Sequence, residues 1–178
     1  HLIALRGTGC AGFVRVRAND PMLVKPYLDL APDAIIFPMI NTPEDAEKEA
    51  KFFLRVIDGC RPEYPVVFDL EDSSQQKLGK STLTDIAKAF LSTVEKAGYY
   101  AMLYANKYWL TGLLDRSRLS NYDVWLAQWS SAPTYSGSYG MWQYSASGSV
   151  PGISGAVDLD YAYGTLSQAN GEYPVDYP

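Results

Sequence analysis

Histidine and cysteine are scarce in this 178-residue chain, and its apolar runs are short. The single histidine is His1, which excludes Ser-His-Asp and Cys-His catalysis, and the two cysteines, Cys10 and Cys60, predict neither a disulfide framework nor a metal site. No apolar run approaches the ~20 residues of a membrane helix, and no basic-then-apolar leader opens the sequence. The formal charge of −5 argues against a nucleic-acid partner. Carboxylates remain as the candidates for catalysis.

Short apolar runs alternate with amphipathic stretches along the chain, a pattern that predicts βα units and a parallel sheet. The length fits one domain over residues 1–178. We expect an α/β fold, an irregular TIM-like (β/α) barrel with about seven strands and few helices in its C-terminal part. The expected strands are residues 13–17, 34–39, 65–70, 100–105, 122–128, 141–144 and 156–161.

Four helices are expected between these strands. Residues 2–5 are interpreted as a helix end rather than an eighth strand, because the connection to the next strand is too short for a parallel crossover. The barrel would then lack a strand, and its open edge would be covered by residues 1–12 or by a second copy of the chain. The expected helices are residues 21–31, a helix from Thr42-Pro43 to about residue 57, a helix from about residue 82 that ends at Gly98, and residues 107–115.

Asp69 and Glu71 lie two residues apart at the C-terminal end of a predicted strand. The strand period of two puts both on one face, and the C-terminal ends of barrel strands are where active sites form. One carboxyl with a raised pKa can protonate a glycosidic oxygen while its neighbour stays ionised. The alternative is that such acids cap the next helix or face water, which we favour for Asp72.

Asp158 and Asp160 form a second alternating pair, in the last predicted strand. A solvated edge strand explains this pair as well as a functional site does. Five aromatic residues at strand ends could stack on sugar rings, although packing within the sheet explains each one alone. They are Tyr104, Trp125, Trp129, Trp142 and Tyr144.

Four segments together resemble glycoside hydrolase family twenty-five, the lysozymes of phages, bacteria and fungi. The resemblance covers about residues 49–164, within a lysozyme-like portion of residues 49–170. Its motifs are YPVVFDLED (64–72), AGYYAMLYAN (97–106), VWLAQW (124–129) and WQYSASGSVPGISGAVDLDYAYG (142–164).

This resemblance implies a peptidoglycan N-acetylmuramidase that requires no metal and no other cofactor. Glu71 would be the general acid, Asp69 would assist the acetamido group of the substrate, and Asp158 would complete the acidic cluster. The partner implied is the glycan strand of peptidoglycan, with no nucleic acid and no membrane. The resemblance implies that Tyr104, Trp129 and Gln143 line the substrate groove. With the strand-end aromatic residues, the expected substrate-binding set is Tyr104, Trp125, Trp129, Trp142, Gln143 and Tyr144.

The start of the chain departs from this family, because the Gly-x-Asp-Val-Ser-like motif that carries another active-site Asp is absent. Residues 1–48 instead resemble metal-dependent 2-keto-3-deoxy sugar-acid aldolases, in FVRVRANDPMLVKPYLDL (13–30) and IIFPMINTPEDAEK (35–48). That likeness would match Arg15 to a keto-acid-binding arginine. Aromatic residues are also unevenly spread, with 21 of 24 after residue 47. These observations predict a chimera of two barrels, of engineered origin, joined near residue 48.

Two functions stay open at this point. The chain is a muramidase whose activity is impaired or lost through replacement of its first strands, or it is a catalytically inactive recombined barrel. A wall-binding module without catalysis is a third hypothesis. The sequence does not fix the oligomeric state, and an open edge would allow a homo-oligomer. The compartment is equally undetermined, since one parent family is exported or phage-released and the other is cytosolic.

Overall fold

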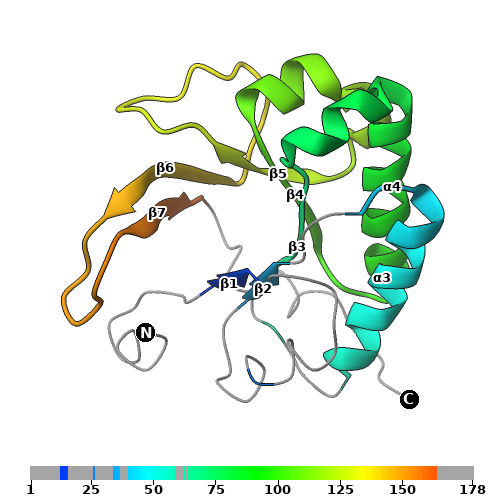
Figure 1. Ribbon diagram of the computed structural model, residues 1–178, viewed down its shortest axis with the longest axis horizontal. Helices are drawn as coiled ribbons and strands as arrows, with labels where there is room; N and C mark the ends of the chain where they lie inside the picture. The colour runs from blue at the N-terminus through cyan, green and yellow to red at the C-terminus, as the bar shows by residue number, and fades with distance from the viewer. Residues whose placement is uncertain are drawn as a thin grey trace.

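The computed structural model describes residues 13–15, 26, 34–36, 40–58, 62 and 64–163 of the chain. Within them, strands β1 (Phe13–Arg15) and β2 (Ala34–Ile36) form a two-stranded parallel sheet. Five further strands form a second sheet in the order β3-β4-β5-β6-β7, which curls into a half-barrel (Figure 1). They are β3 (Val66–Asp69), β4 (Ala101–Asn106), β5 (Asp123–Ala127), β6 (Met141–Gly148) and β7 (Val157–Ala162).

Each of these strands overlaps one of the seven expected from the sequence, but they do not make one closed barrel. β2 lies beside β3, yet the described residues show no hydrogen-bonded ladder between the two sheets. The architecture shown is therefore a mixed α/β fold with a curled five-stranded sheet. Several sequence expectations concern residues outside the described part of the chain. These are the helix over residues 21–31, of which only Pro26 is described, the segment 1–12 and both cysteines.

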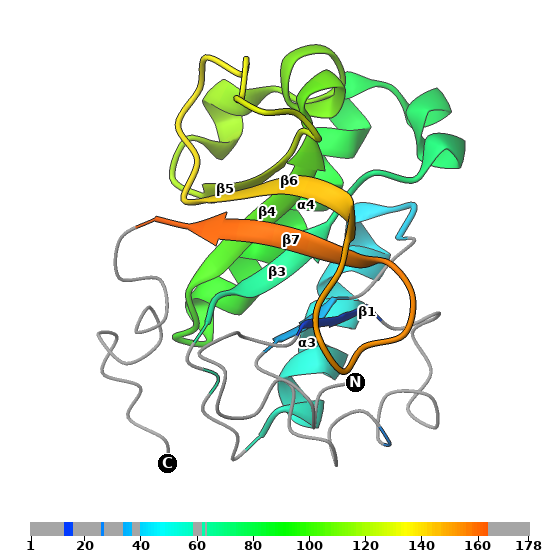
Figure 2. The same ribbon diagram turned by 90° about the vertical axis from the view of Figure 1, so that its left-hand side faces the viewer.

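The direction of the last strand differs from the expected parallel arrangement. β3 to β6 run parallel to one another, whereas β7 runs antiparallel to β6, as Figure 2 shows. Only residues 149–156 connect these two strands, with Gly152 and Gly155 at positive φ. A parallel connection needs a dozen or more residues, so a link of this length can only form a hairpin.

The two long helices lie together against the convex side of the sheet (Figure 1). Helix α3 (Pro43–Val56) begins as predicted, with the Thr42 side chain accepting a hydrogen bond from the Asp45 backbone N–H and proline at the first helical position. Helix α4 (Lys80–Lys96) ends where glycine was expected to stop it, since Gly98 has a φ of 86°.

Shorter helical segments follow two of the strands. The 3₁₀ helix η1 (Ser73–Leu78) comes directly after Glu71-Asp72 and is capped by Asp72, which accepts from the Ser74 backbone N–H as predicted. A π-helical turn, η2 (Trp109–Leu113), and a 3₁₀ turn, η3 (Arg116–Leu119), connect β4 to β5. The turn η2 lies in the predicted helical stretch 107–115.

Alternation along the strands divides the interior into two sides. Phe68, Leu103 and Leu126 point toward the helices, where Phe68 stacks on Phe90 of α4 with ring centroids 4.6 Å apart. The neighbouring side chains point to the concave side and form a separate cluster. The helix side holds the sheet in place, and the concave side carries the polar residues. The buried members of the concave cluster are Val67, Met102, Tyr104, Trp125, Ala127 and Met141.

Candidate active site

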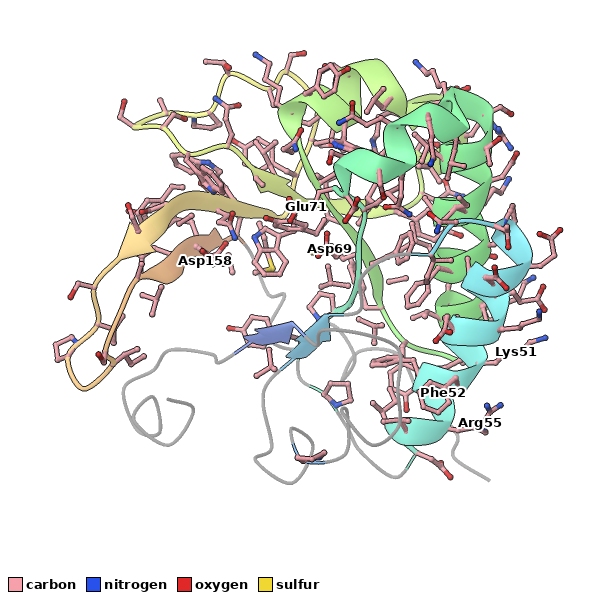
Figure 3. The ribbon with its side chains drawn as sticks, viewed as in Figure 1. Lys51, Phe52, Arg55, Asp69, Glu71 and Asp158 are labelled. Atoms are coloured by element: carbon pink, nitrogen blue, oxygen red, sulfur yellow. The ribbon has the colours of Figure 1, made fainter. Side chains whose placement is uncertain are left out.

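Asp69 is the last residue of β3 and is 4% exposed, and Glu71 follows two residues later with intermediate exposure. Figure 3 shows both at the end of β3, with Asp158 on β7 across the concave side of the sheet. Asp69 is also paired in register with Tyr104 of β4. The sequence expectation that Asp69 and Glu71 project from one strand end thus agrees with their placement.

Tyr104 lies at the centre of the acidic residues. Burial raises the pKa of its hydroxyl, and the negative charges of Glu71, Asp69, Asp158 and Asp160 raise that pKa further, in this order. Strand register and hydrogen bonding agree with this, because Asp69 is paired with Tyr104, and the Tyr104 hydroxyl bonds to Gln143, whose register partner on β7 is Asp160. The structure therefore assembles the two alternating acidic pairs of the sequence into one cluster around Tyr104.

The Tyr104 hydroxyl donates a hydrogen bond to Oε1 of Gln143, at 3.1 Å. Gln143 lies on β6, is 4% exposed, and is paired in register with Ala127 on one side and Asp160 on the other. The same Oε1 accepts a second hydrogen bond from the indole Nε1 of Trp129, at 2.7 Å. Gln143 thus joins the acidic cluster to the loop that follows β5.

Asp160 is a member of the cluster whose pKa lies well above its ordinary value. Burial raises its pKa to about 7, a hydrogen bond from Trp125 opposes this, and the neighbouring charge of Asp158 adds to it. Burial also raises the pKa of Asp158 above its ordinary value. Carboxyl groups that keep a proton near neutral pH are suited to acid catalysis or to donating hydrogen bonds. Sequence analysis noted Asp160 beside Asp158 but did not place it in the site.

The predicted aromatic residues divide between two faces. Trp125 packs edge-on against Tyr104 on the concave side with ring centroids 5.0 Å apart, but it is 3% exposed, so its ring is covered. Trp129, at 66% exposure, presents an open ring beside Gln143. Of the predicted sugar-stacking residues on this side, Trp129 offers the accessible surface.

Trp142 and Tyr144 lie on the opposite face of β6 from Gln143. The Trp142 indole donates to the backbone oxygen of Gln128, and its ring lies 5.8 Å from those of Tyr144 and Tyr161. Both residues pack with the helix-side core. Because their rings pack on this side of the sheet, we do not retain Trp142 and Tyr144 beside the carboxylates.

The described part of the chain shows neither a metal-binding group of side chains nor a membrane-spanning helix. No group of three or more His, Cys, Asp or Glu side chains there is arranged to hold a metal ion. No helix there has the length and hydropathy to span a membrane.

The model of one family, described as Glycosyl hydrolases family 25, matches residues 30–153. The chain belongs to this family. The family 25 match includes β3 with Asp69 and Glu71, β4 with Tyr104, and the part of β6 that carries Gln143. It also crosses residue 48, where the sequence predicts a joint. Residues 30–48 therefore match family 25, and neither this match nor the likeness to solved structures supports an aldolase fragment or an engineered chimera.

Three individual proteins show the extent of the likeness. The uncharacterized protein YegX of Escherichia coli O6:H1 is 29% identical over 130 residues, which are 71% of this chain and 46% of YegX. The CTP1L endolysin is 25% identical with a TM-score of 0.68, over 96% of this chain and 64% of the endolysin. The spore cortex lytic enzyme SleM of Clostridium perfringens is 20% identical with a TM-score of 0.71, over 91% of this chain and 62% of SleM. The chain thus spans about half to two thirds of the length of these relatives.

Proposed function

We propose that this family 25 chain is a peptidoglycan hydrolase that cleaves the glycan strand as an N-acetylmuramidase. The observation that carries the proposal is the group of carboxylates beside Tyr104, to which the end of β3 and the strand β7 both contribute. The CTP1L protein is an endolysin and SleM is a spore cortex lytic enzyme, which supports a cell-wall glycan as the substrate class.

Glu71 is the proposed general acid. Its intermediate exposure leaves it accessible to a substrate, whereas Asp69 is buried beside it. Glu71 donates its proton to the glycosidic oxygen as the bond from that oxygen to the anomeric carbon breaks. The acetamido group on the sugar that contains this anomeric carbon attacks it through its carbonyl oxygen, while Asp69 accepts the hydrogen bond of the acetamido N–H. Water then attacks the anomeric carbon and opens the cyclic intermediate, and a proton from this water returns to Glu71.

Asp158 is proposed as the third acid of the cluster. Its pKa is raised by burial, and Asp160 lies two residues further along the same strand face. In this arrangement Asp158 stands across the sheet from Glu71, where it can accept hydrogen bonds from sugar hydroxyl groups. Tyr104, Gln143 and Trp129 complete the proposed substrate contacts.

The second candidate function is a catalytically inactive chain. This is the alternative that the sequence leaves open.

Clearing of a purified peptidoglycan suspension separates these candidates. The parent chain should clear the suspension and release fragments that end in reducing N-acetylmuramic acid. Glu71→Gln should abolish clearing with the circular dichroism spectrum unchanged, while Asp58→Asn, at an exposed residue after α3, should retain it. A folded parent without turnover would favour the inactive chain. Retained binding to insoluble peptidoglycan by Glu71→Gln, with no turnover in the parent, would identify a wall-binding module.

A further inference from the structure

The side-chain amide of Gln143 has a fixed orientation. Its Oε1 accepts hydrogen bonds from the Tyr104 hydroxyl at 3.1 Å and from the Trp129 indole at 2.7 Å. An indole N–H can only donate, so the oxygen end of the amide must face Trp129. The nitrogen end therefore points away from both donors.

The nitrogen end of Gln143 is available for a ligand. Among the described residues no hydrogen bond involves Nε2, although Gln143 is 4% exposed and lies on the concave side of the sheet. An amide nitrogen carries two donors and accepts nothing. The group that satisfies it must therefore present an acceptor oxygen.

Trp129 places an open aromatic face beside the same amide group. Its indole is 66% exposed even though its N–H is bonded to Gln143. The preceding residue ties the loop down, because Gln128 donates through Nε2 to Thr134 Oγ1 at 3.0 Å and accepts through Oε1 from the Thr134 backbone N–H at 3.1 Å. Lys107 also donates to Thr134 Oγ1, at 2.7 Å. The ring and the amide are thus held together before any ligand arrives.

We propose that Gln143 and Trp129 form a recognition site for the acetamido group of an N-acetylated sugar. Gln143 Nε2 donates to the acetamido carbonyl oxygen, and the Trp129 ring packs against the methyl group and the sugar ring. This inference rests on the proposed function and adds a specificity determinant to it. The acetamido group concerned is a different one from the group that attacks the anomeric carbon, because a donor on the attacking oxygen would weaken it as a nucleophile.

The chemistry of the pair favours an acetamido group over a hydroxyl group. An acetamido group combines a carbonyl acceptor with an apolar methyl group, which matches a donor beside an indole face. A sugar hydroxyl supplies an acceptor without the methyl group. The contact between the methyl group and the indole face is therefore what separates the two sugars.

Two neutral trisaccharides test the proposal on the full chain by isothermal titration calorimetry. Chitotriose and cellotriose share the β-1,4 linkage and differ in carrying a 2-acetamido or a 2-hydroxyl group. The parent should bind chitotriose at least about tenfold more tightly than cellotriose. In Gln143→Glu, which keeps an oxygen for Tyr104 and Trp129 but removes the N–H donors, this ratio should fall to within about threefold.

Further variants keep the test decisive. Gln143→Met removes the donor without adding charge and should give the same loss of selectivity. Trp129→Phe removes the indole N–H, so that only the rotatable Tyr104 hydroxyl still orients the Gln143 amide. The ratio of the two sugar affinities should therefore fall in part. The control Tyr161→Phe changes an exposed ring on the opposite face and should keep the parent ratio. Each variant is first checked for the parent's circular dichroism spectrum.

An equal affinity of the parent for both sugars, or the parent ratio in Gln143→Glu and Gln143→Met, would overturn the proposal. This outcome is distinguishable from failure of the proposed function, because binding needs no turnover. Selective binding without clearing of peptidoglycan would preserve the acetamido site and reject the hydrolase. Clearing without selectivity would do the reverse.

Discussion

The indole Nε1 of Trp125 donates to Oδ1 of Asp160 at 2.7 Å, which joins β5 to β7 across the intervening strand β6. This bond stabilises the ionised carboxylate, yet the pKa of Asp160 still rises to about 7 because burial outweighs it. The folded protein therefore binds a proton at Asp160 that the unfolded chain, with an aspartate pKa of about 3.9, releases at lower pH.

Asp160→Asn should flatten the pH dependence of stability between about pH 4 and pH 7. A carboxyl whose pKa is raised on folding contributes stability below its unfolded pKa, and that contribution is lost as the pH rises through the folded value. The parent should therefore lose stability, on the order of 3 kcal/mol, over this interval. Urea unfolding at pH 4.5 and pH 7.5 measures it. Asp58→Asn controls for removing one charge, and an unchanged slope in Asp160→Asn would rule out this account.

Thr42→Ala should lower the free energy of unfolding by about 1 kcal/mol. The Thr42 hydroxyl accepts from the Asp45 backbone N–H, and alanine leaves that donor without its partner at the start of α3. Denaturant titration of the two proteins measures the difference. Lys48→Ala, which removes an exposed ion pair to Asp45, is the control and should cost at most about 0.5 kcal/mol. Equal losses in the two variants would contradict the capping role.

Phe90→Ala should destabilise the protein by about 3 to 5 kcal/mol, since it removes a ring that is 1% exposed and stacked on Phe68. Phe90→Leu preserves most of the volume and should cost much less. Thermal unfolding followed by circular dichroism measures both. The prediction fails if alanine is tolerated as well as leucine. Phe68 directly precedes Asp69, so we also expect the alanine variant to lose affinity for substrate.

Gly148→Ala should weaken the β6–β7 hairpin. A Cβ atom at Gly148 would collide with the side chain of Leu159 on the paired strand. Overpacking of this kind costs about 1 to 3 kcal/mol. A double-mutant cycle with Leu159→Ala isolates the collision, because the shorter side chain leaves room for the added methyl group. Additive losses in the double variant would mean that the collision is not the cause.

The sequence predicted most elements because their signals are local. Thr42-Pro43 and Gly98 mark helix ends by their own chemistry, and the apolar runs mark strands. The direction of β7 was missed although the short connection over residues 149–156 carried the necessary information. The expectation of an all-parallel barrel was applied to a segment where the connection length excludes it.

The sequence placed some site residues on the concave face and misplaced others, again because only local signals can be read from it. Alternation pointed to the pairs Asp69/Glu71 and Asp158/Asp160, the resemblance to family 25 assigned roles to Asp69, Glu71 and Asp158, and the structure places these three near Tyr104. Trp142 and Tyr144 were chosen together with Gln143 without applying the same alternation, which would have put Gln143 on the other face. The bond from Trp129 to Gln143 and the raised pKa of Asp160 depend on contacts between strands, and a single sequence does not specify these.

The reversal of β7 has a consequence for the order of folding. A hairpin closed by eight residues has a low loop-closure entropy and forms from contacts near in sequence, whereas β3, β4 and β5 must be joined across helices. We therefore expect the two acidic pairs to acquire structure on different timescales. The bond between Tyr104 and Gln143 links the two units, and we expect its formation to accompany the assembly of the active site.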